Sequence, residues 1–257
     1  MNGSDTIRDV AISETEVLIE LRNASLKYPV GSLNQMSIKT AFLSPLANNS
    51  EYMPKEFEAL KSVSLTVKRG DRLGIIGHNG AGKSTILRAI AGIYPLHSGQ
   101  VLVNGEIQSL FDIGVGFDPE ESGRNNIYHR GYLLGYTRRD IEEIEQEVIE
   151  FSGVGEFIDM PVKTFSTGMQ VRLAFAVSTA LGGSILLIDE VLSAGDAEFA
   201  LKAHARMKKL IDNASCLVLV SHDMGAIKTI CNRALLLDDG NIAAIGDVDD
   251  VISKYLG

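Results

Sequence analysis

Segment Gly77–Ser84 combines three glycines with a terminal lysine and serine, in the order Gly77-His78-Asn79-Gly80-Ala81-Gly82-Lys83-Ser84. It fits the phosphate-loop pattern G-x-x-x-x-G-K-[ST] at every position. An aliphatic run, Arg72–Ile76, precedes it, and helical spacing follows over Lys83–Ala91. In this setting backbone N–H groups surround a phosphate, Lys83 reaches the β- and γ-phosphates, and the Ser84 hydroxyl ligates Mg²⁺. A glycine-rich turn with a chance lysine is the alternative, which the complete match disfavours.

Two acidic residues follow a continuously apolar run, Ile185–Ile188. Such a run is typical of a strand buried on both faces of a parallel sheet. Asp189 then lies at the carboxyl end of the strand, where it can hold Mg²⁺ directly or through water. Glu190 beside it can orient and deprotonate a water that attacks a γ-phosphate. By itself an acidic pair after a strand is more often a solvated loop, and the upstream phosphate loop reverses those odds.

From about Val17 to its C-terminus, the sequence resembles the nucleotide-binding subunits of ABC transporters. The most specific element is Phe165-Ser166-Thr167-Gly168-Met169-Gln170, which is similar to the family signature LSGGQ. The resemblance implies that this segment of one subunit caps the γ-phosphate held by the phosphate loop of a second. Two copies of the chain would then form a homodimer, head to tail, over two ATP molecules. Without that context, Ser-Thr-Gly is a good helix N-cap.

Further family elements follow in order. Ser193-Ala194-Gly195-Asp196 resembles the D-loop, although Leu is usual at Gly195, and His222 resembles the switch histidine that contacts the γ-phosphate. Tyr28 is the candidate for the aromatic residue that stacks on adenine, with Tyr52 and Phe57 as alternatives. The implied catalytic residues are Glu190 and His222, and the implied Mg²⁺ ligands are Ser84 and Asp189. The implied ATP-binding set is Tyr28, Gly77, His78, Asn79, Gly80, Ala81, Gly82, Lys83, Ser84, Thr85, Ser166, Thr167, Gly168 and Met169.

One family element lacks a counterpart. The family usually has a glutamine between the phosphate loop and the helical segment, in contact with Mg²⁺ and the attacking water. The stretch Ser109–Pro119 contains no glutamine, and Gln108 comes too early. We therefore transfer no role to any residue of this stretch.

Where the sequence departs from the general family pattern, it resembles one branch of the family. These are the ATPases that export bacterial cell-surface polysaccharides such as O-antigen, capsule and teichoic acid. The segments concerned are Ser166–Val177, Gly114–Glu120, Gly123–Ile127, Gly195–Phe199 and the long insertion 29–58. This implies a chain at the cytoplasmic face of the inner membrane, bound to a permease that moves a lipid-linked polysaccharide. The chain would meet that polysaccharide only indirectly. Because the sequence stops at Gly257, we expect no added carbohydrate-binding domain.

Other classes fit less well. DNA-repair ABC ATPases insert a long coiled coil before the signature, whereas Lys83–Ser166 has no sustained heptads. Ribosome-associated members normally carry two cassettes, and this chain has one. An importer subunit is a nearer alternative, against which the Ser-Thr-Gly-Met signature and the insertion argue. A net charge of −9 disfavours a nucleic-acid partner.

Composition sets the remaining bounds. The 257 residues allow one large domain or two small ones. Two cysteines cannot form a disulfide framework and fit a reducing compartment. No apolar run approaches the ~20 residues of a membrane span, and Met1–Glu16 lacks the apolar region of a signal peptide. We expect a soluble, cytoplasmic protein.

The alternation of apolar runs and helical spacing predicts an α/β core interrupted by a helical insertion. The resemblance to ABC transporter subunits implies that this α/β fold is a RecA-like P-loop ATPase core with an antiparallel β-subdomain and an inserted helical subdomain. Residues 1–16 are expected to form a flexible tail and 17–257 the ATPase domain, with the helical subdomain at 121–181. The turn Asn104-Gly105 predicts a hairpin between Gln100–Val103 and Glu106–Phe111. Ala234–Leu237 and Ile242–Ile245 are expected to be edge strands.

Overall fold

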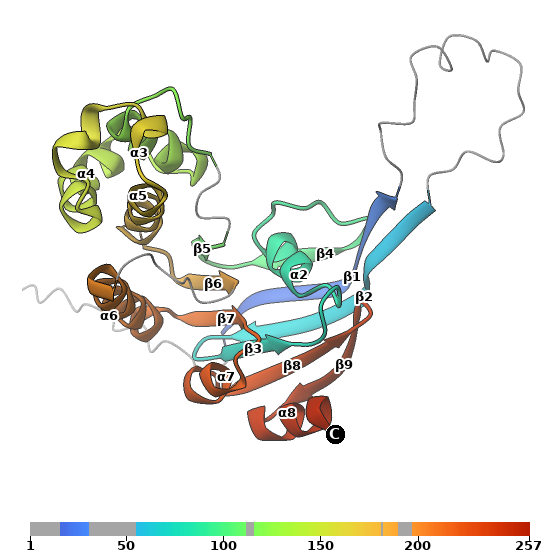
Figure 1. Ribbon diagram of the computed structural model, residues 1–257. Coiled ribbons are helices and arrows are strands. Elements are labelled where there is room, and N and C mark those ends of the chain that lie inside the picture. Colours follow the sequence, from blue (N-terminus) through green and yellow to red (C-terminus); the bar gives the residue numbers. More distant parts are fainter. Residues whose placement is uncertain (1–15, 31–54, 112–115, 181, 190–196) are drawn as a thin grey trace, which may run out of the picture.

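The computed structural model describes residues 16–30, 55–111, 116–180, 182–189 and 197–257 (Figure 1). Residues 1–15 of the proposed tail 1–16 and most of the insertion, including Tyr52, lie outside the described residues. The strands are β1 (Val17–Val30), β2 (Lys55–Lys68), β3 (Arg72–Ile76), β4 (Ser98–Val103), β5 (Ile107–Leu110), β6 (Ile185–Asp189), β7 (Cys216–Val220), β8 (Arg233–Asp238) and β9 (Asn241–Gly246). The α-helices are α2 (Lys83–Ile90), α3 (Gly123–Leu133), α4 (Arg138–Ser152), α5 (Thr167–Ala180), α6 (Ala197–Asn213), α7 (Met224–Ile230) and α8 (Val248–Leu256).

The central element is a six-stranded sheet in the order β5-β6-β7-β3-β8-β9. All neighbours in it are parallel except β8 and β9. Every residue of β7 is buried, and so are the first four residues of β6. The continuously apolar runs therefore correctly predicted strands covered on both faces. Because β3, β6 and β7 are parallel, their carboxyl ends meet at one edge of the sheet.

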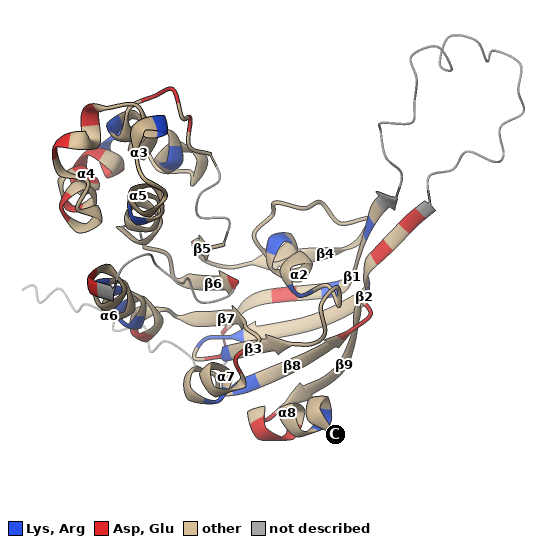
Figure 2. Cartoon of the chain, in the orientation of Figure 1, with Lys and Arg blue, Asp and Glu red and all other residues tan. Residues whose placement is uncertain are grey.

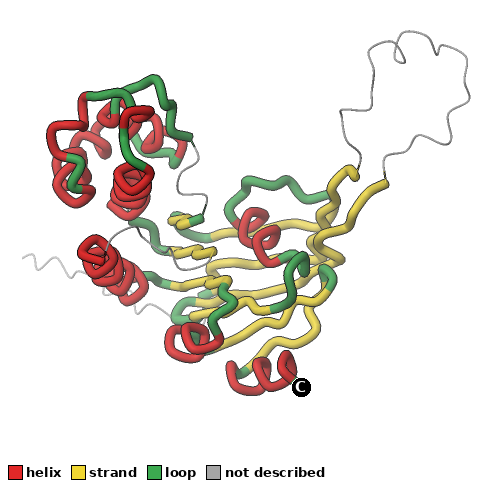
Figure 3. The backbone as a smooth tube through the Cα atoms, viewed as in Figure 1, coloured by secondary structure: helices red, strands yellow, loops and turns green. Residues whose placement is uncertain are grey.

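A second, three-stranded antiparallel sheet has the order β2-β1-β4 (Figure 3). Its strands β1 and β2 pair from Val17 opposite Lys68 to Val30 opposite Lys55. Both strands therefore run further than the sequence predicts, and the flanks of the proposed insertion belong to the sheet. Pro29 is compatible with this strand because β1 pairs with β4 only as far as Ser25, so Pro29 lies where β1 has β2 as its partner strand and not β4.

The predicted hairpin around Asn104-Gly105 is wrong. Strand β4 pairs with β1 in the small sheet, whereas β5 pairs with β6 in the large one. The turn carries the chain between sheets: Asn104 N–H donates to Leu18 O at 2.8 Å, and Glu106 O accepts from Ile185 N at 3.0 Å. Gly105 (φ +140°) is required here because a Cβ would lie 2.6 Å from Ser184 Oγ. Local turn chemistry was correctly detected, but the partners of the strands were set by residues far away.

A smaller correction concerns the last two strands. Of these two strands only β9 lies at an edge of the sheet, because β8 pairs with β9 on one side and with β3 on the other. Four buried aliphatic or alanine positions in a row, Ala234–Leu237, are the physical reason: such a strand needs cover on both faces.

The helical subdomain, defined here as Gly123–Ala180, contains α3, α4 and α5 with the short 3₁₀ turns η2 (Gly155–Asp159) and η3 (Val162–Thr164). It has a hydrophobic cluster of its own, separate from the two clusters of the sheets. The helices expected in this part of the chain are present, and α5 begins at Thr167, inside the signature segment. The limits 121–181 stay a prediction.

An aromatic joint connects this subdomain to the large sheet. Phe151 of α4, Phe175 of α5 and Phe199 of α6 form three ring contacts with centroids 5.5–6.0 Å apart. The guanidinium of Arg206 lies over the Phe151 ring at 4.1 Å and forms an ion pair with Glu147. These contacts join α6, which packs against the large sheet, to α4 and α5 of the helical subdomain.

Two further observations bear on the composition-based expectations. Cys216 and Cys231 are both buried free thiols, and burial raises the pKa of each to about 12. In the part of the chain that the structure describes, no helix is both long enough and apolar enough to cross a membrane.

Candidate functional site

The phosphate loop leads from the end of β3 to the start of α2, as the motif predicts. Gly77 and Gly82 adopt φ of +148° and +104°. A Cβ at Gly77 would lie 2.2 Å from Leu237 O, and one at Gly82 would lie 2.6 Å from Ala59 O. Glycine is needed at both positions because neighbouring main chain occupies the space of a side chain.

Lys83 lies inside the curve of this loop. It is only 7% exposed, and its Nζ donates to Gly77 O at 2.8 Å and to His78 O at 2.9 Å. These two main-chain carbonyls hold the Lys83 ammonium at the N-terminal end of α2, where the helix dipole is also positive. The two effects together make this point a strong anion site.

The other predicted groups approach from the neighbouring strand ends. Asp189 is the last residue of β6, and His222 lies two residues beyond β7. Both line one cavity of about 500 Å³ together with residues of the phosphate loop. The lining residues are Tyr28, Phe57, Ala59, Asn79, Gly80, Gly82, Lys83, Ser84, Thr85, Phe111, Asp189, Val220 and His222. Residues distant in sequence are thus brought together at the carboxyl edge of the sheet, where open α/β sheets bind ligands.

The donor set of this cavity fits a nucleotide with its Mg²⁺. The Ser84 hydroxyl and the Asp189 carboxylate supply the oxygen ligands that Mg²⁺ prefers, and Lys83 supplies the cation for phosphate. Among the described residues no group of three His, Cys, Asp or Glu side chains forms a metal site.

Two aromatic side chains lie at the side of the cavity formed by the small sheet. Tyr28 and Phe57 are cross-strand partners on β1 and β2, and both line the cavity. The Tyr28 hydroxyl lies 3.4 Å from Thr85 Oγ1, and its ring makes an edge contact with Tyr94 at 5.7 Å. Phe57 is 45% exposed. Both sequence candidates in the described residues therefore line the cavity, and the contact of either ring with a base stays a prediction.

The signature residues lie elsewhere. Ser166 precedes α5, and its Oγ accepts from Met169 N–H at 3.2 Å, as an N-cap residue does. Ser166 and Thr167 are exposed, and the lining of the cavity includes none of Ser166, Thr167, Gly168 and Met169. Figure 1 shows α5 in the helical subdomain, apart from α2. The N-terminus of α5 therefore presents N–H groups and hydroxyls to the outside of this chain.

Several predicted residues do not line the cavity or lie outside the described residues. Gly77, His78 and Ala81 belong to the loop without lining the cavity. Glu190 and the D-loop candidate Ser193–Asp196 lie outside the described residues.

Sequence reasoning missed Phe111, which follows β5 and is 5% exposed at the cavity wall. Recognising β5 as a parallel neighbour of β6 would have located it, because it would have placed Phe111 at the same edge as Asp189.

The sheet order and the loop at its edge define a P-loop ATPase fold. A sequence profile of the family described as ABC transporter matches residues 60–193. A solved structure described as a dimeric, post-hydrolysis ATP-binding cassette bound to ADP and phosphate superposes with a TM-score of 0.65 at 21% identity, covering 90% of this chain and 99% of that one. The chain belongs to the ABC transporter family.

Curated relatives are more specific. The chain is 42% identical over 201 residues to the ABC transporter protein AbcA of Aeromonas salmonicida, covering 78% of this chain and 65% of that protein. It is 39% identical over 225 residues to the O-antigen export system ATP-binding protein RfbE of Yersinia enterocolitica, covering 86% and 94%. It is 36% identical over 235 residues to the teichoic acids export ATP-binding protein TagH of Shouchella clausii (strain KSM-K16), covering 91% and 64%. The chain thus spans less than two thirds of AbcA and of TagH.

Proposed function

We propose that this chain binds and hydrolyses ATP and thereby drives the export of a lipid-linked cell-surface polysaccharide across the bacterial inner membrane. The observation that carries the first part is the single cavity that unites Lys83, Ser84, Asp189 and His222. The second part is supported by relatives named for O-antigen and teichoic acid export.

Each side chain has a task in this reaction. Lys83 and the loop N–H groups bind the phosphates and neutralise their charge. Ser84 and Asp189 hold Mg²⁺, which when bound offsets the charge that develops on the phosphate oxygens. His222 extends from the end of β7 toward the same cavity and contacts the γ-phosphate. Glu190, which follows Asp189 directly in sequence, orients and deprotonates the attacking water.

The exposed signature at the start of α5 calls for a second copy of the chain. In a head-to-tail homodimer the N–H groups after Ser166 cap the phosphate held by the partner. The dimeric cassette described above supports such an arrangement. An integral-membrane permease completes the assembly and holds the chain at the cytoplasmic face of the inner membrane, and no nucleic acid takes part.

Recognition of the polysaccharide is assigned to the permease. The chain has no Trp, and one aromatic pair near the surface, Tyr128 and Tyr132 of α3, is tilted by 55° in a hollow of about 330 Å³. Two rings at that angle offer no flat platform for a sugar. We therefore expect the isolated chain to bind ATP and no free glycan.

The test separates binding from turnover. Lys83→Ala removes the buried cation, so ATP binding itself is lost; Lys202→Ala, which removes an exposed lysine of α6, is the matched control. Glu190→Gln keeps ATP binding, loses nearly all turnover, and accumulates as an ATP-bound dimer in size-exclusion chromatography with Mg²⁺-ATP. In cells, both site variants abolish export of the surface polysaccharide. Near wild-type turnover in Glu190→Gln, or export that survives in both variants, contradicts the proposal.

A further inference from the structure

The second residue of the phosphate loop makes a contact that nucleotide chemistry does not require. The imidazole of His78 lies against the phenol ring of Tyr255, with centroids 5.1 Å apart and planes tilted by 48°. Tyr255 belongs to α8, the last helix described, so the two residues are 177 positions apart in sequence. This contact links the phosphate loop to an element outside the nucleotide cavity.

Helix α8 is firmly attached to the core. Val248, Val251 and Ile252 are 3–8% exposed and pack into the second hydrophobic cluster. The side chain of Asp247 caps its first turn by accepting from Asp249 N–H at 2.9 Å. At the other end Lys254 Nζ donates to Ala243 O of β9 at 2.8 Å. The helix that carries Tyr255 is therefore fixed to the core, and so is the position from which Tyr255 contacts His78.

His78 in turn is tied to the residue that binds phosphate. Its carbonyl oxygen accepts from Lys83 Nζ at 2.9 Å and from Ala81 N–H at 3.2 Å. A displacement of the His78 main chain therefore moves an acceptor of the Lys83 ammonium. The same loop rests on the β8–β9 turn through the bond from Gly240 N–H to Ala81 O at 3.1 Å. Tyr255 supports the part of the loop that this turn does not reach.

Helix α8 also contacts the element that follows His222. Lys228 of α7 forms an ion pair of 2.6 Å with Asp249 of α8. The N-cap of α7 is Asp223, directly after His222. One helix is thus attached both to the phosphate loop and to the helix behind the second phosphate-contacting group.

We propose that Tyr255 is a positioning residue of the phosphate loop and that docking of α8 is coupled to nucleotide binding. The proposal rests on the proposed function, because it assumes that the loop binds ATP. Coupling of this kind is reciprocal: a contact that stabilises the nucleotide-binding loop is itself stabilised when nucleotide binds. A ligand or modification that displaces α8 lowers ATP affinity.

The experiment measures the dissociation constant of a non-hydrolysable ATP analogue by calorimetry on the full chain. Tyr255→Ala weakens binding about 2- to 10-fold, the range that the worth of an aromatic pair gives. Tyr255→Phe retains the ring and restores most of the affinity. Leu256→Ala, which truncates a 73% exposed neighbour on the same helix, binds like the wild type. In the His78→Ala background Tyr255→Ala has no further effect, because the contact is already lost.

A second measurement does not depend on the folding of the Tyr255→Ala variant. Hydrogen exchange of the α8 amides slows when the analogue binds to the wild type, and this protection is absent in His78→Ala, which changes an exposed loop side chain. Equal affinity of Tyr255→Ala and wild type, additive effects of the two substitutions, or α8 protection that survives in His78→Ala overturns the inference and leaves the proposed function intact. Absence of binding to the wild type overturns both.

Discussion

The phosphate loop and the helical subdomain are held in place by different kinds of contact. The loop rests on main chain: Leu237 O and Ala59 O occupy the space where Gly77 and Gly82 would have side chains. The helical subdomain has a hydrophobic cluster of its own, and charged side chains add ion pairs at its surface. Figure 2 shows charged residues concentrated on α3 and α4, whereas the central strands carry few. The phosphate loop has no space for an added atom at Gly77 or Gly82, whereas a subdomain whose elements also share a hydrophobic cluster tolerates the loss of one exposed ion pair.

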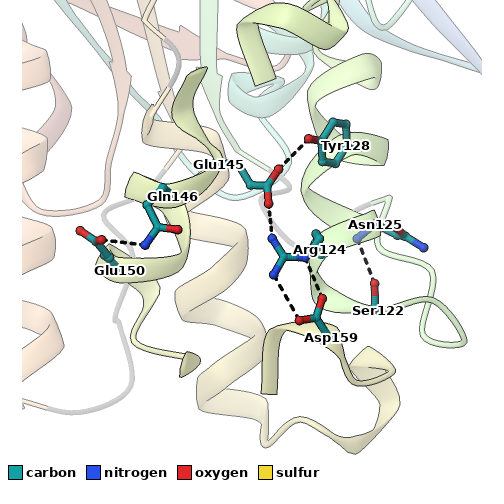
Figure 4. Close-up of polar contacts among 8 residues, drawn as sticks. All are labelled: Ser122, Arg124, Asn125, Tyr128, Glu145, Gln146, Glu150 and Asp159. Carbon is teal, nitrogen blue, oxygen red and sulfur yellow. Dashed lines mark hydrogen bonds and ion pairs between the residues drawn. The ribbon is translucent and has the colours of Figure 1, made fainter. Parts of the chain in front are cut away.

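Arg124 is the centre of the second kind of contact (Figure 4). Its Nε donates to Asp159 Oδ1 at 2.7 Å and its NH2 nitrogen to Oδ2 at 3.2 Å, while its NH1 nitrogen pairs with Glu145. The other carboxylate oxygen of Glu145 accepts from the Tyr128 hydroxyl at 2.6 Å. One guanidinium thus connects α3, α4 and η2, at a position where it is 37% exposed and partly screened by solvent.

The largest effect is expected from a single methyl group added to the phosphate loop. We expect Gly77→Ala to lower the free energy of unfolding by more than about 5 kcal/mol, or to prevent folding, because its Cβ would lie 2.2 Å from a carbonyl oxygen. Gly92→Ala is the matched control: it also has positive φ (+72°), but no atom lies within 4 Å. It should cost about 1 kcal/mol. Chemical denaturation of both variants measures the loss in the free energy of unfolding. Equal losses would contradict the view that neighbouring main chain leaves no space for a side chain at Gly77.

The aromatic joint between the two regions comes next. Phe199→Ala removes a ring that is 4% exposed and contacts both Phe151 and Phe175. The expected loss in the free energy of unfolding is about 3–4 kcal/mol, from lost burial and the cavity left behind. Phe157→Ala, at a ring that is 42% exposed, should lose less than half as much. Thermal unfolding at matched concentration measures both, and a mild effect at Phe199 would show that the regions are joined elsewhere.

A charge removed from the helical subdomain should have a smaller effect. Arg124→Ala is expected to lower Tm by about 2–4 °C, because exposed pairs contribute little, and to leave affinity for ATP unchanged. Arg139→Ala, which disrupts an ion pair whose arginine is 87% exposed, should change Tm by less. Calorimetric scans and ATP titrations test both variants. Loss of ATP affinity in Arg124→Ala would mean that the network reaches the nucleotide site.

The same network predicts a pH effect at one tyrosine. The Glu145 carboxylate, hydrogen-bonded to the hydroxyl, raises the pKa of Tyr128 to about 12. Since the folded value exceeds the usual value of 10.0, the stabilisation is fully present below pH 10 and is lost as the pH rises toward 12. Difference absorbance of tyrosinate in the wild type and in Tyr128→Phe isolates this group. In Glu145→Gln its titration should move to lower pH, and an unchanged titration would remove Glu145 as the cause.

The sequence predicted the structure best where the residues of a functional motif also specify the local secondary structure. The phosphate loop and the run Ile185–Ile188 predict both the chemistry and the strands, so the convergence of Lys83 and Asp189 was predictable. The resemblance to ABC transporter subunits added His222. The hairpin failed because Asn104-Gly105 specifies a turn but not the partners of its strands. Those partners depend on Ser184 and Ile185, about 80 residues further on. The same error hid Phe111.

The placement of β3 also determines when this protein can become functional during its synthesis. Its neighbours in the sheet, β7 and β8, are encoded about 140 residues or more downstream. At ribosomal speeds of about 5–20 residues per second, β3 waits roughly 7 to 30 seconds before either partner exists. Until then the apolar strand and its glycine loop are unpaired on the nascent chain, and Leu237, against which Gly77 rests, has not been made. We therefore expect ATP binding to arise only after β8 has been synthesised, in one late and cooperative step.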